Sequence, residues 1–189
     1  RDHLEGCWSL FGDKRIQVNL ADGLRAAMDD GDDLLVAPGC GFEDAIEGGM
    51  QAALAAANQA DVVLLAVGEP QNYSGEAQSR NQIVLPAVQQ ALAEAVASTG
   101  KPVVVLLRNG RALALEGAVR NADAIVVTWF LGSQTGTAVA DVVFGDFNPC
   151  GKLPVSFPSL VGQQPLYYNR ARSGRPELPD MTEFKTRWR

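Results

Sequence analysis

Short aliphatic runs alternate along this chain with segments in which apolar residues recur every three or four positions. The aliphatic runs show almost no polar alternation, which is typical of strands covered on both faces. The segments between them have the spacing of amphipathic helices. The expected strands lie at residues 32–39, 61–68, 101–110 and 122–130, and the expected helices lie at residues 43–60, 85–99 and 133–145.

Two of the expected helices carry a clear apolar stripe. In the helix at residues 85–99, Val88, Leu92 and Val96 lie about one helical turn apart. In the helix at residues 43–60, the stripe consists of Ile46, Met50, Ala53, Leu54 and Ala57.

Alternating strands and helices predict an α/β fold with an open, mostly parallel twisted sheet and helices on both faces, a flavodoxin-like α/β sandwich. Residues 62–67 and 103–107 are aliphatic throughout, so we expect both faces of each of these strands to be covered. In open parallel sheets, the loops that leave the carboxyl ends of the strands carry the ligand site. The candidate chemistry should therefore lie on those loops.

The C-terminal part of the chain has a different character. Residues 148–180 are rich in proline and glycine and have no helical period. Residues 152–157 could form an edge strand, because Pro154 and Pro158 lack the backbone donor that a central strand needs. We expect residues 1–165 to form the sandwich domain and residues 166–189 an extended tail.

Composition and charge exclude several functional classes. The chain has 189 residues, 47% of them hydrophobic and 20% charged, which fits one core-forming globular domain. Its net charge is −6, so we expect no nucleic-acid partner, because that surface requires clustered basic residues. No apolar stretch reaches the roughly 20 residues of a membrane span, and we expect no membrane partner.

Histidine and cysteine chemistry is poorly supported. The single histidine, His3, leaves no Ser/His/Asp triad, no Cys/His dyad and no histidine-ligated zinc site. Cys7, Cys40 and Cys150 are odd in number and widely spaced, which fits neither a disulfide framework nor a metal site, although one pair could bridge. We therefore expect no metal and no cofactor.

The sequence GSQTGT, residues 132–137, joins an expected strand to an expected helix in the manner of a phosphate-binding loop. It lacks both the GxGxxG and the GK[ST] signatures. A tight turn capped by Ser133 or Thr135 is the favoured interpretation. A flavodoxin-like module that binds flavin mononucleotide or phosphate remains the alternative.

Two acids, Glu69 and Glu76, lie on the loop that follows residues 61–68. A general acid must be exposed to substrate yet partly desolvated, and such a loop can provide both conditions. Two solvated surface acids are the plainer interpretation. Arg80 or Arg108 could also pair with one acid, which would favour its ionised form. Near the start, Trp8 lies beside glycine, where an aromatic ring can stack on a sugar or simply pack.

Several segments together resemble the second, α/β domain of glycoside hydrolase family three, the bacterial periplasmic β-glucosidase type. They include EGCWSLFGDKRIQVNLADGL, DVVLLAVGEPQNYSGEAQSRNQIVLPAVQQAL, GKPVVVLL and QQPLYYN, and above all WFLGSQTGTAVADVVFGDFNPCGKLPVSFP. The segments follow the family's order over nearly the whole chain.

The resemblance implies a part of a retaining, exo-acting β-glucosidase that acts on terminal β-linked glucose in glucosides or oligosaccharides. In this family an Asp nucleophile lies on an N-terminal barrel and a Glu acid/base on the α/β domain. Glu76, in YSGEAQSR, matches the acid/base, Glu69 is the strand-end residue before it, and Trp8 resembles the aromatic residue that flanks the leaving-group sugar.

The resemblance also implies what these residues lack. They contain no barrel and no nucleophile motif of the SDW type, so this stretch is expected to hold half of an active site and to be inactive alone. Its expected partners are the barrel and a β-glucoside or oligosaccharide, and its expected location is periplasmic or secreted. A domain that retains only a packing role is a further alternative.

Overall fold

A parallel sheet lies at the centre of residues 3–169, the part of the chain that the computed structural model describes. Within that part the strand order is β1 (Val63–Gly68), β2 (Val103–Arg108) and β3 (Ala124–Val127). Both pairings are parallel, with Val63 opposite Val103 and Val104 opposite Ala124. Three of the four expected strands are therefore confirmed, each with shorter bounds.

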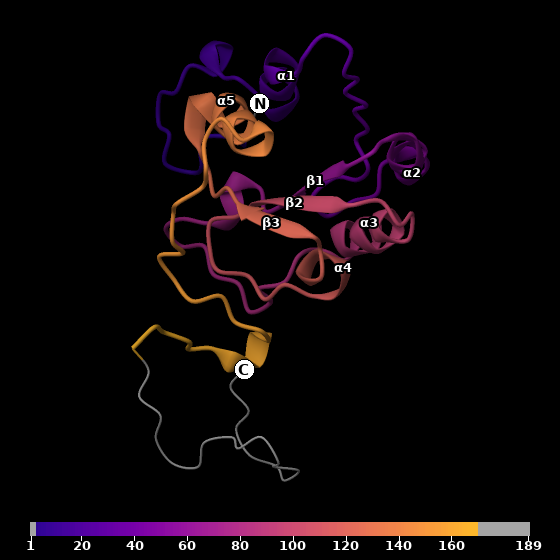
Figure 1. Cartoon of the computed structure of the whole chain (residues 1–189). Helices are drawn as coiled ribbons and strands as arrows, with labels where there is room; N and C mark the ends of the chain where they lie inside the picture. Colours follow the sequence, from indigo (N-terminus) through magenta and orange to yellow (C-terminus); the bar gives the residue numbers. More distant parts are fainter. Residues whose placement is uncertain (1–2, 170–189) are drawn as a thin grey trace.

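Helices cover both faces of this sheet. Figure 1 shows α1 and α5 packed together on one side, and α3 and α4 on the other, with α2 beside α3. The helices are α1 (Leu20–Ala27), α2 (Gly49–Gln59), α3 (Ala87–Ala97), α4 (Gly117–Arg120) and α5 (Thr135–Phe144). The predicted α/β class, with a parallel sheet between two helical layers, is confirmed.

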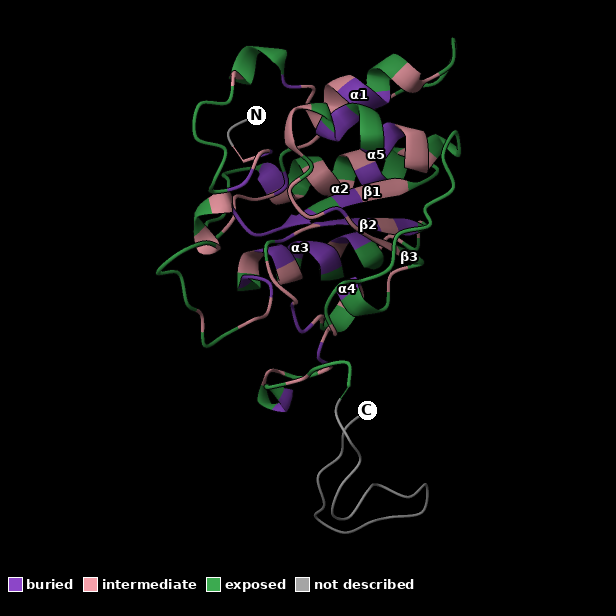
Figure 2. Cartoon of the chain, turned by 90° about the vertical axis from the view of Figure 1, so that its left-hand side faces the viewer, coloured by how far each residue is buried: buried purple, intermediate pink, exposed green. Residues whose placement is uncertain are grey.

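The core is centred on β2. Val105 and Leu107 have no exposed surface, and the strand is buried along most of its length (Figure 2). Leu92 and Val96 of α3 pack against it from one side, as the apolar stripe predicts. Coverage of both faces is thus confirmed for β2 but only in part for β1, where Val62, just before the strand, is 51% exposed.

The outer edge of β1 pairs with no other strand among the described residues. The N–H groups of Val63 and Glu69 point toward the β2 side, donating to Pro102 O and Arg108 O, so the alternate residues face the open edge. At Gly68 the buried side-chain amide of Gln89 takes the place of a strand. It accepts from Gly68 N–H at 2.7 Å and donates to Gly68 O at 2.9 Å.

The expected strand at residues 32–39 is wrong, because this segment has no strand in the structure. Leu35 and Val36 are 46% and 60% exposed. An aliphatic run becomes a strand only when a neighbour satisfies its backbone N–H and C=O groups, and no described strand pairs with this run.

Helix boundaries differ from the expected ones for local reasons. The helix expected at residues 43–60 begins only at Gly49, because Gly48 adopts the left-handed conformation (φ 70°) that interrupts a helix. Ile46 therefore lies outside the helix. Pro86 stands at the N-cap of α3, and Gly145, also left-handed (φ 86°), ends α5.

Helix α1 was not predicted from the sequence. Its N-cap is Asn19, whose side-chain oxygen accepts from Asp22 N–H at 3.0 Å. This Asn followed three residues later by Asp is the signal that could have revealed the helix start.

The expected edge strand at residues 152–157 is also wrong, since this segment is mostly exposed and not paired into the sheet. Most of the expected tail, residues 170–189, lies outside the described residues.

Replacing Gln89 by leucine should destabilise the domain. The substitution leaves the N–H and C=O of Gly68 and the C=O of Phe42 without their partner, and burying unpaired polar groups should lower the free energy of unfolding by about 3 kcal/mol. Urea unfolding of Gln89→Leu and wild type measures the difference. Gln51→Leu is the matched control, because Gln51 is exposed and is also the third residue of its helix. Equal stability of the two variants would contradict the assigned role of Gln89.

Candidate active site

Loops from the carboxyl ends of the three strands meet at one edge of the sheet. A Cβ added to Gly110, after β2, would lie 2.1 Å from Ser74 Oγ, so the loop after β1 packs directly on the loop after β2. The N-terminal segment joins them, because Gly132 N–H, after β3, donates to Leu4 O at 2.9 Å. The parallel topology therefore collects the candidate residues in one region.

Glu69 lies at the end of β1 and is buried, with 1% of its surface exposed. Its Oε1 is 3.3 Å from Arg111 Nε and 4.0 Å from Arg80 Nε. The predicted pairing of an acid with Arg80 is therefore seen for Glu69. Two guanidinium groups offset the burial of this carboxylate, which would otherwise strongly disfavour the fold.

Arg108 forms no ion pair with either acid, contrary to the alternative raised by the sequence. Its guanidinium lies 5.3 Å from the centre of the Phe42 ring, and burial lowers its pKa from the usual value. Sequence reasoning missed Arg111, which forms the ion pair with Glu69 that was considered for Arg108. Its place just after β2, at the edge where the loops meet, is the signal that could have identified it.

Tyr73 connects the two arginines to a second acid. Its ring lies beneath the Arg80 guanidinium at 4.0 Å, and its backbone carbonyl accepts from Arg111 Nη2. Its hydroxyl donates to Glu43, which is also 3.9 Å from Arg80. The bond to Glu43 is the main reason that the pKa of Tyr73 is raised, since it favours the protonated phenol.

Glu76 is exposed, unlike Glu69, and its side chain forms no ion pair or hydrogen bond within residues 3–169. The residues on either side adopt positive φ, 125° at Gly75 and 59° at Ala77. This backbone turns sharply at Glu76 and leaves its carboxyl group projecting from a constrained loop.

Trp8 lies against the same loop. A Cβ added to Gly75 would lie 3.4 Å from Trp8 Nε1 and 2.7 Å from Cys7 Sγ. The indole itself is 63% exposed, so it is not a core residue. The structure thus brings Trp8 close to the residue that precedes Glu76 and leaves both side chains open to solvent.

The loop at residues 132–137 forms a tight strand-to-helix turn, as the favoured interpretation expects. The expected cap is wrong, because the N-cap of α5 is Gln134, which makes no side-chain cap, and Thr135 Oγ1 instead donates back to Gly132 O at 2.7 Å. Gly136 N–H donates to Val18 O at 2.9 Å. Because this N–H already donates within the chain, the turn has fewer free N–H donors for a phosphate than a free helix N-terminus would have.

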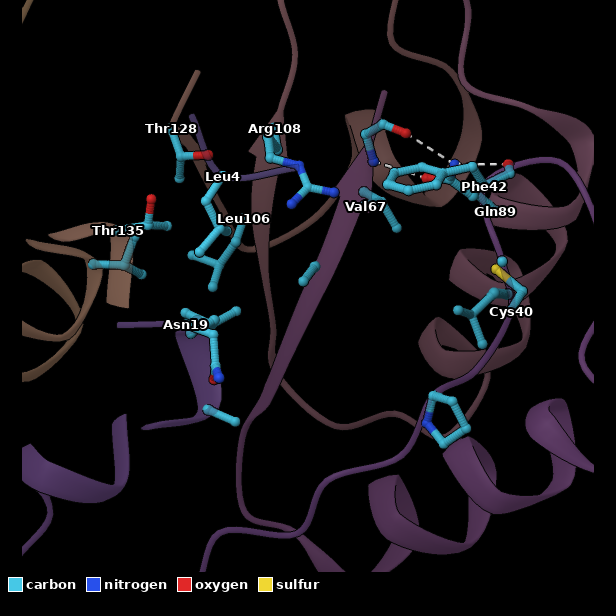
Figure 3. Close-up of a pocket in the computed structure, with 18 residues that line it drawn as sticks. Leu4, Asn19, Cys40, Phe42, Val67, Gln89, Leu106, Arg108, Thr128 and Thr135 are labelled. Carbon is cyan, nitrogen blue, oxygen red and sulfur yellow. Dashed lines mark hydrogen bonds between the residues drawn. The ribbon is translucent and has the colours of Figure 1, made fainter. Parts of the chain in front are cut away.

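A hollow of about 380 Å³ lies along the open edge of β1 (Figure 3). Its walls include Leu106 and Thr135 on one side of the sheet and Gln89 and Phe42 on the other, and the Arg108 side chain points into it. Neither Glu76 nor Trp8 lines this hollow. The two exposed candidates therefore lie apart from it, at the outer surface of the loops.

Three further observations concern metal ligands, thiols and membrane spans in the described residues. Residues 3–169 contain no group of three His, Cys, Asp or Glu side chains that could hold a metal ion. Cys7, Cys40 and Cys150 are free thiols, and burial raises the pKa of Cys40. No helix in this part of the chain is long and apolar enough to cross a membrane.

The fold and these loops define an α/β sandwich domain that presents an acid and an indole at the carboxyl edge of its sheet. The sequence profile of the glycosyl hydrolase family 3 C-terminal domain matches residues 1–186, and the chain belongs to this family. The resemblance inferred from the sequence is thereby confirmed, and the flavodoxin-like alternative is not favoured.

Named relatives agree with this assignment. The chain is 42% identical to a periplasmic β-glucosidase of Salmonella typhimurium over 93% of its own length and 26% of the relative. It is 41% identical to a β-xylosidase of Formosa agariphila over 80% of its length and 21% of the relative. A crystal structure of β-glucosidase from Listeria innocua in complex with isofagomine superposes with a TM-score of 0.86 at 36% identity, over 98% of this chain and 25% of that one. The chain thus spans about a fifth to a quarter of the length of these relatives.

The bond between Tyr73 and Glu43 should be visible in an alkaline titration. Its stabilisation is complete below about pH 10, the pKa of an unfolded tyrosine, and is lost as the pH rises through the raised pKa of the folded state. Glu43→Gln should move the Tyr73 transition to lower pH. Tyrosine absorbance, with Tyr73→Phe subtracted to isolate this residue, measures the shift, and an unchanged transition would contradict the assigned bond.

Proposed function

We propose that this domain supplies the general acid/base of a retaining, exo-acting β-glucosidase, and that Glu76 is that residue. The observation that carries the proposal is the contrast between the two acids of one loop. Glu69 is buried and paired with arginines, whereas Glu76 is exposed and forms no ion pair with a described residue. An acid that must exchange protons with a substrate needs the second environment.

The proposed reaction requires a carboxylate nucleophile from the barrel domain. That carboxylate attacks the anomeric carbon, the bond from this carbon to the leaving oxygen breaks, and protonated Glu76 gives its proton to the leaving oxygen. Glu76 then takes a proton from water, whose oxygen attacks the same carbon and releases the nucleophile. The two carboxyl groups should stand roughly 5 Å apart, as in retaining enzymes generally.

The barrel has a second role in this proposal. A general acid is protonated more readily when it is partly desolvated, and the described residues leave Glu76 exposed. Docking of a barrel over the loop edge would cover Glu76 on that side and leave room for the sugar. Trp8 would then form one wall, its exposed ring available to stack on the leaving-group sugar.

The substrate class follows from the relatives rather than from this chain alone. Relatives named β-glucosidase and β-xylosidase favour a β-linked terminal sugar, and glucose is proposed on the similarity to the β-glucosidases. The proposed location, periplasmic or secreted, rests on the relative named as a periplasmic β-glucosidase. We also propose that residues 1–165 form the sandwich domain and residues 166–189 an extended tail.

The test is Glu76→Gln in the full-length enzyme. Turnover of a glucoside with a poor leaving group should fall about 10²- to 10⁴-fold, because its departing oxygen needs a proton. Formation of the glycosyl-enzyme from an aryl glucoside with a good leaving group should be nearly unchanged. Azide should restore turnover of the aryl glucoside, since it attacks the intermediate without a general base.

Glu47→Gln is the matched control, an exposed glutamate of the same chain outside these loops. This variant should leave the turnover of both substrates unchanged. If Glu76→Gln reduces turnover of both substrates equally and azide has no effect, Glu76 is not the acid/base. Full activity of the variant on both substrates would also exclude Glu76 as the acid/base.

A further inference from the structure

The buried carboxylate of Glu69 lies near two cations through one oxygen, Oε1, an arrangement that the end of a strand does not require. Its backbone N–H already continues the ladder by donating to Arg108 O at 2.8 Å. Its side chain adds contacts to Arg111 and Arg80, two cations that come from different loops. Burying a charge is unfavourable unless it is paired, so a residue needed only to end the strand would be better apolar.

Both arginines contact the loop that carries Glu76. Arg111 donates to the backbone carbonyl of Tyr73, and Arg80 covers the Tyr73 ring at 4.0 Å. Glu43 holds the same residue from its hydroxyl end. Tyr73, three residues before Glu76, is therefore held at its backbone, its ring and its hydroxyl.

The remaining part of the loop is confined by packing. Ser74 lies against Gly110, and Gly75 lies against Cys7 and Trp8 so closely that a methyl group at either glycine would collide. Glu76 follows directly, and no ion pair with another described residue holds its side chain. Its position is thus set by the backbone to which Glu69, Arg80 and Arg111 are connected.

We propose that Glu69 is a positioning residue, which acts on the reaction only through Glu76. Its carboxylate fixes Arg80 and Arg111, the two arginines fix Tyr73, and the loop then places the carboxyl group of Glu76 at the leaving oxygen. This inference rests on the proposed function of Glu76. A displacement of about 1 Å in a reacting group can reduce a rate about 10²-fold, so loss of the network should slow proton transfer measurably.

A double-mutant cycle in the full-length enzyme tests the inference. Glu69→Gln, which keeps the shape but removes the charge, should reduce kcat about 10- to 100-fold on a glucoside with a poor leaving group. The loss on an aryl glucoside with a good leaving group should be much smaller. In the Glu76→Gln background, Glu69→Gln should cause no further loss, because the group on which it acts is already absent.

The opposite results would overturn the proposal. Equal losses on both substrates, or the same loss with and without Glu76, would mean that Glu69 serves only the stability of the fold. Arg80→Gln is a second variant, at a residue that is 25% exposed; it removes one of the two cations that contact Glu69 and leaves the other, Arg111, in place. It should reproduce the selective loss on poor leaving groups.

A measurement on the 189-residue chain separates this inference from the function of Glu76. In Glu69→Gln, hydrogen exchange should accelerate at the amides of residues 71–78 while those of β2 stay protected. Glu47→Gln should leave both regions unchanged. Unaltered exchange in the loop, or faster exchange throughout the sheet, would overturn the positioning role whatever Glu76 does. Faster loop exchange together with no effect of Glu76→Gln on turnover would refute the proposed acid/base, and with it the catalytic role of Glu69, and would leave only the ordering of the loop by Glu69.

Discussion

The parallel ladder through β2 is the constraint on which the rest of the structure depends. Because β2 is hydrogen-bonded on both sides and buried on both faces, its register fixes β1 and β3 and the helices above and below them. Parallel strands also place their carboxyl ends at one edge. For that reason loops far apart in sequence, at Ser74, Gly110 and Gly132, meet near the N-terminal segment.

The same geometry gives the two glutamates of one loop opposite environments. Glu69 directly follows β1, where the sheet and α3 exclude water, and two arginines must accompany its charge. Glu76 lies seven residues later, past a turn with positive φ on both sides, and reaches solvent. Burial and pairing make the first acid a structural anchor, and exposure makes the second available for chemistry.

The candidate acid and the indole of this domain are exposed together at the loop edge, and the chain covers about a quarter of the length of the relatives that it matches. A glycosidase site needs two carboxyl groups on either side of a bond. In the proposed arrangement this domain would supply one of the two carboxyl groups and a neighbouring domain the other. The rate would then depend on how precisely the loop holds its carboxyl group.

Most strands and helices could be predicted from the sequence, because they depend on local periodicity. The aliphatic runs from Val63 to Val67 and from Val103 to Leu107, and the stripe of Leu92 and Val96, depend only on which residues follow one another. The same holds for the motifs around Glu76 and at residues 129–158, which indicated the family.

The sequence could not determine which distant groups contact one another. Residues 32–39 have the composition of a strand but no paired neighbour among the described strands, and Arg111 rather than Arg108 reaches Glu69. Pairing of strands and the burial of a charge beside its partners depend on three-dimensional proximity, so only the tertiary structure determined them.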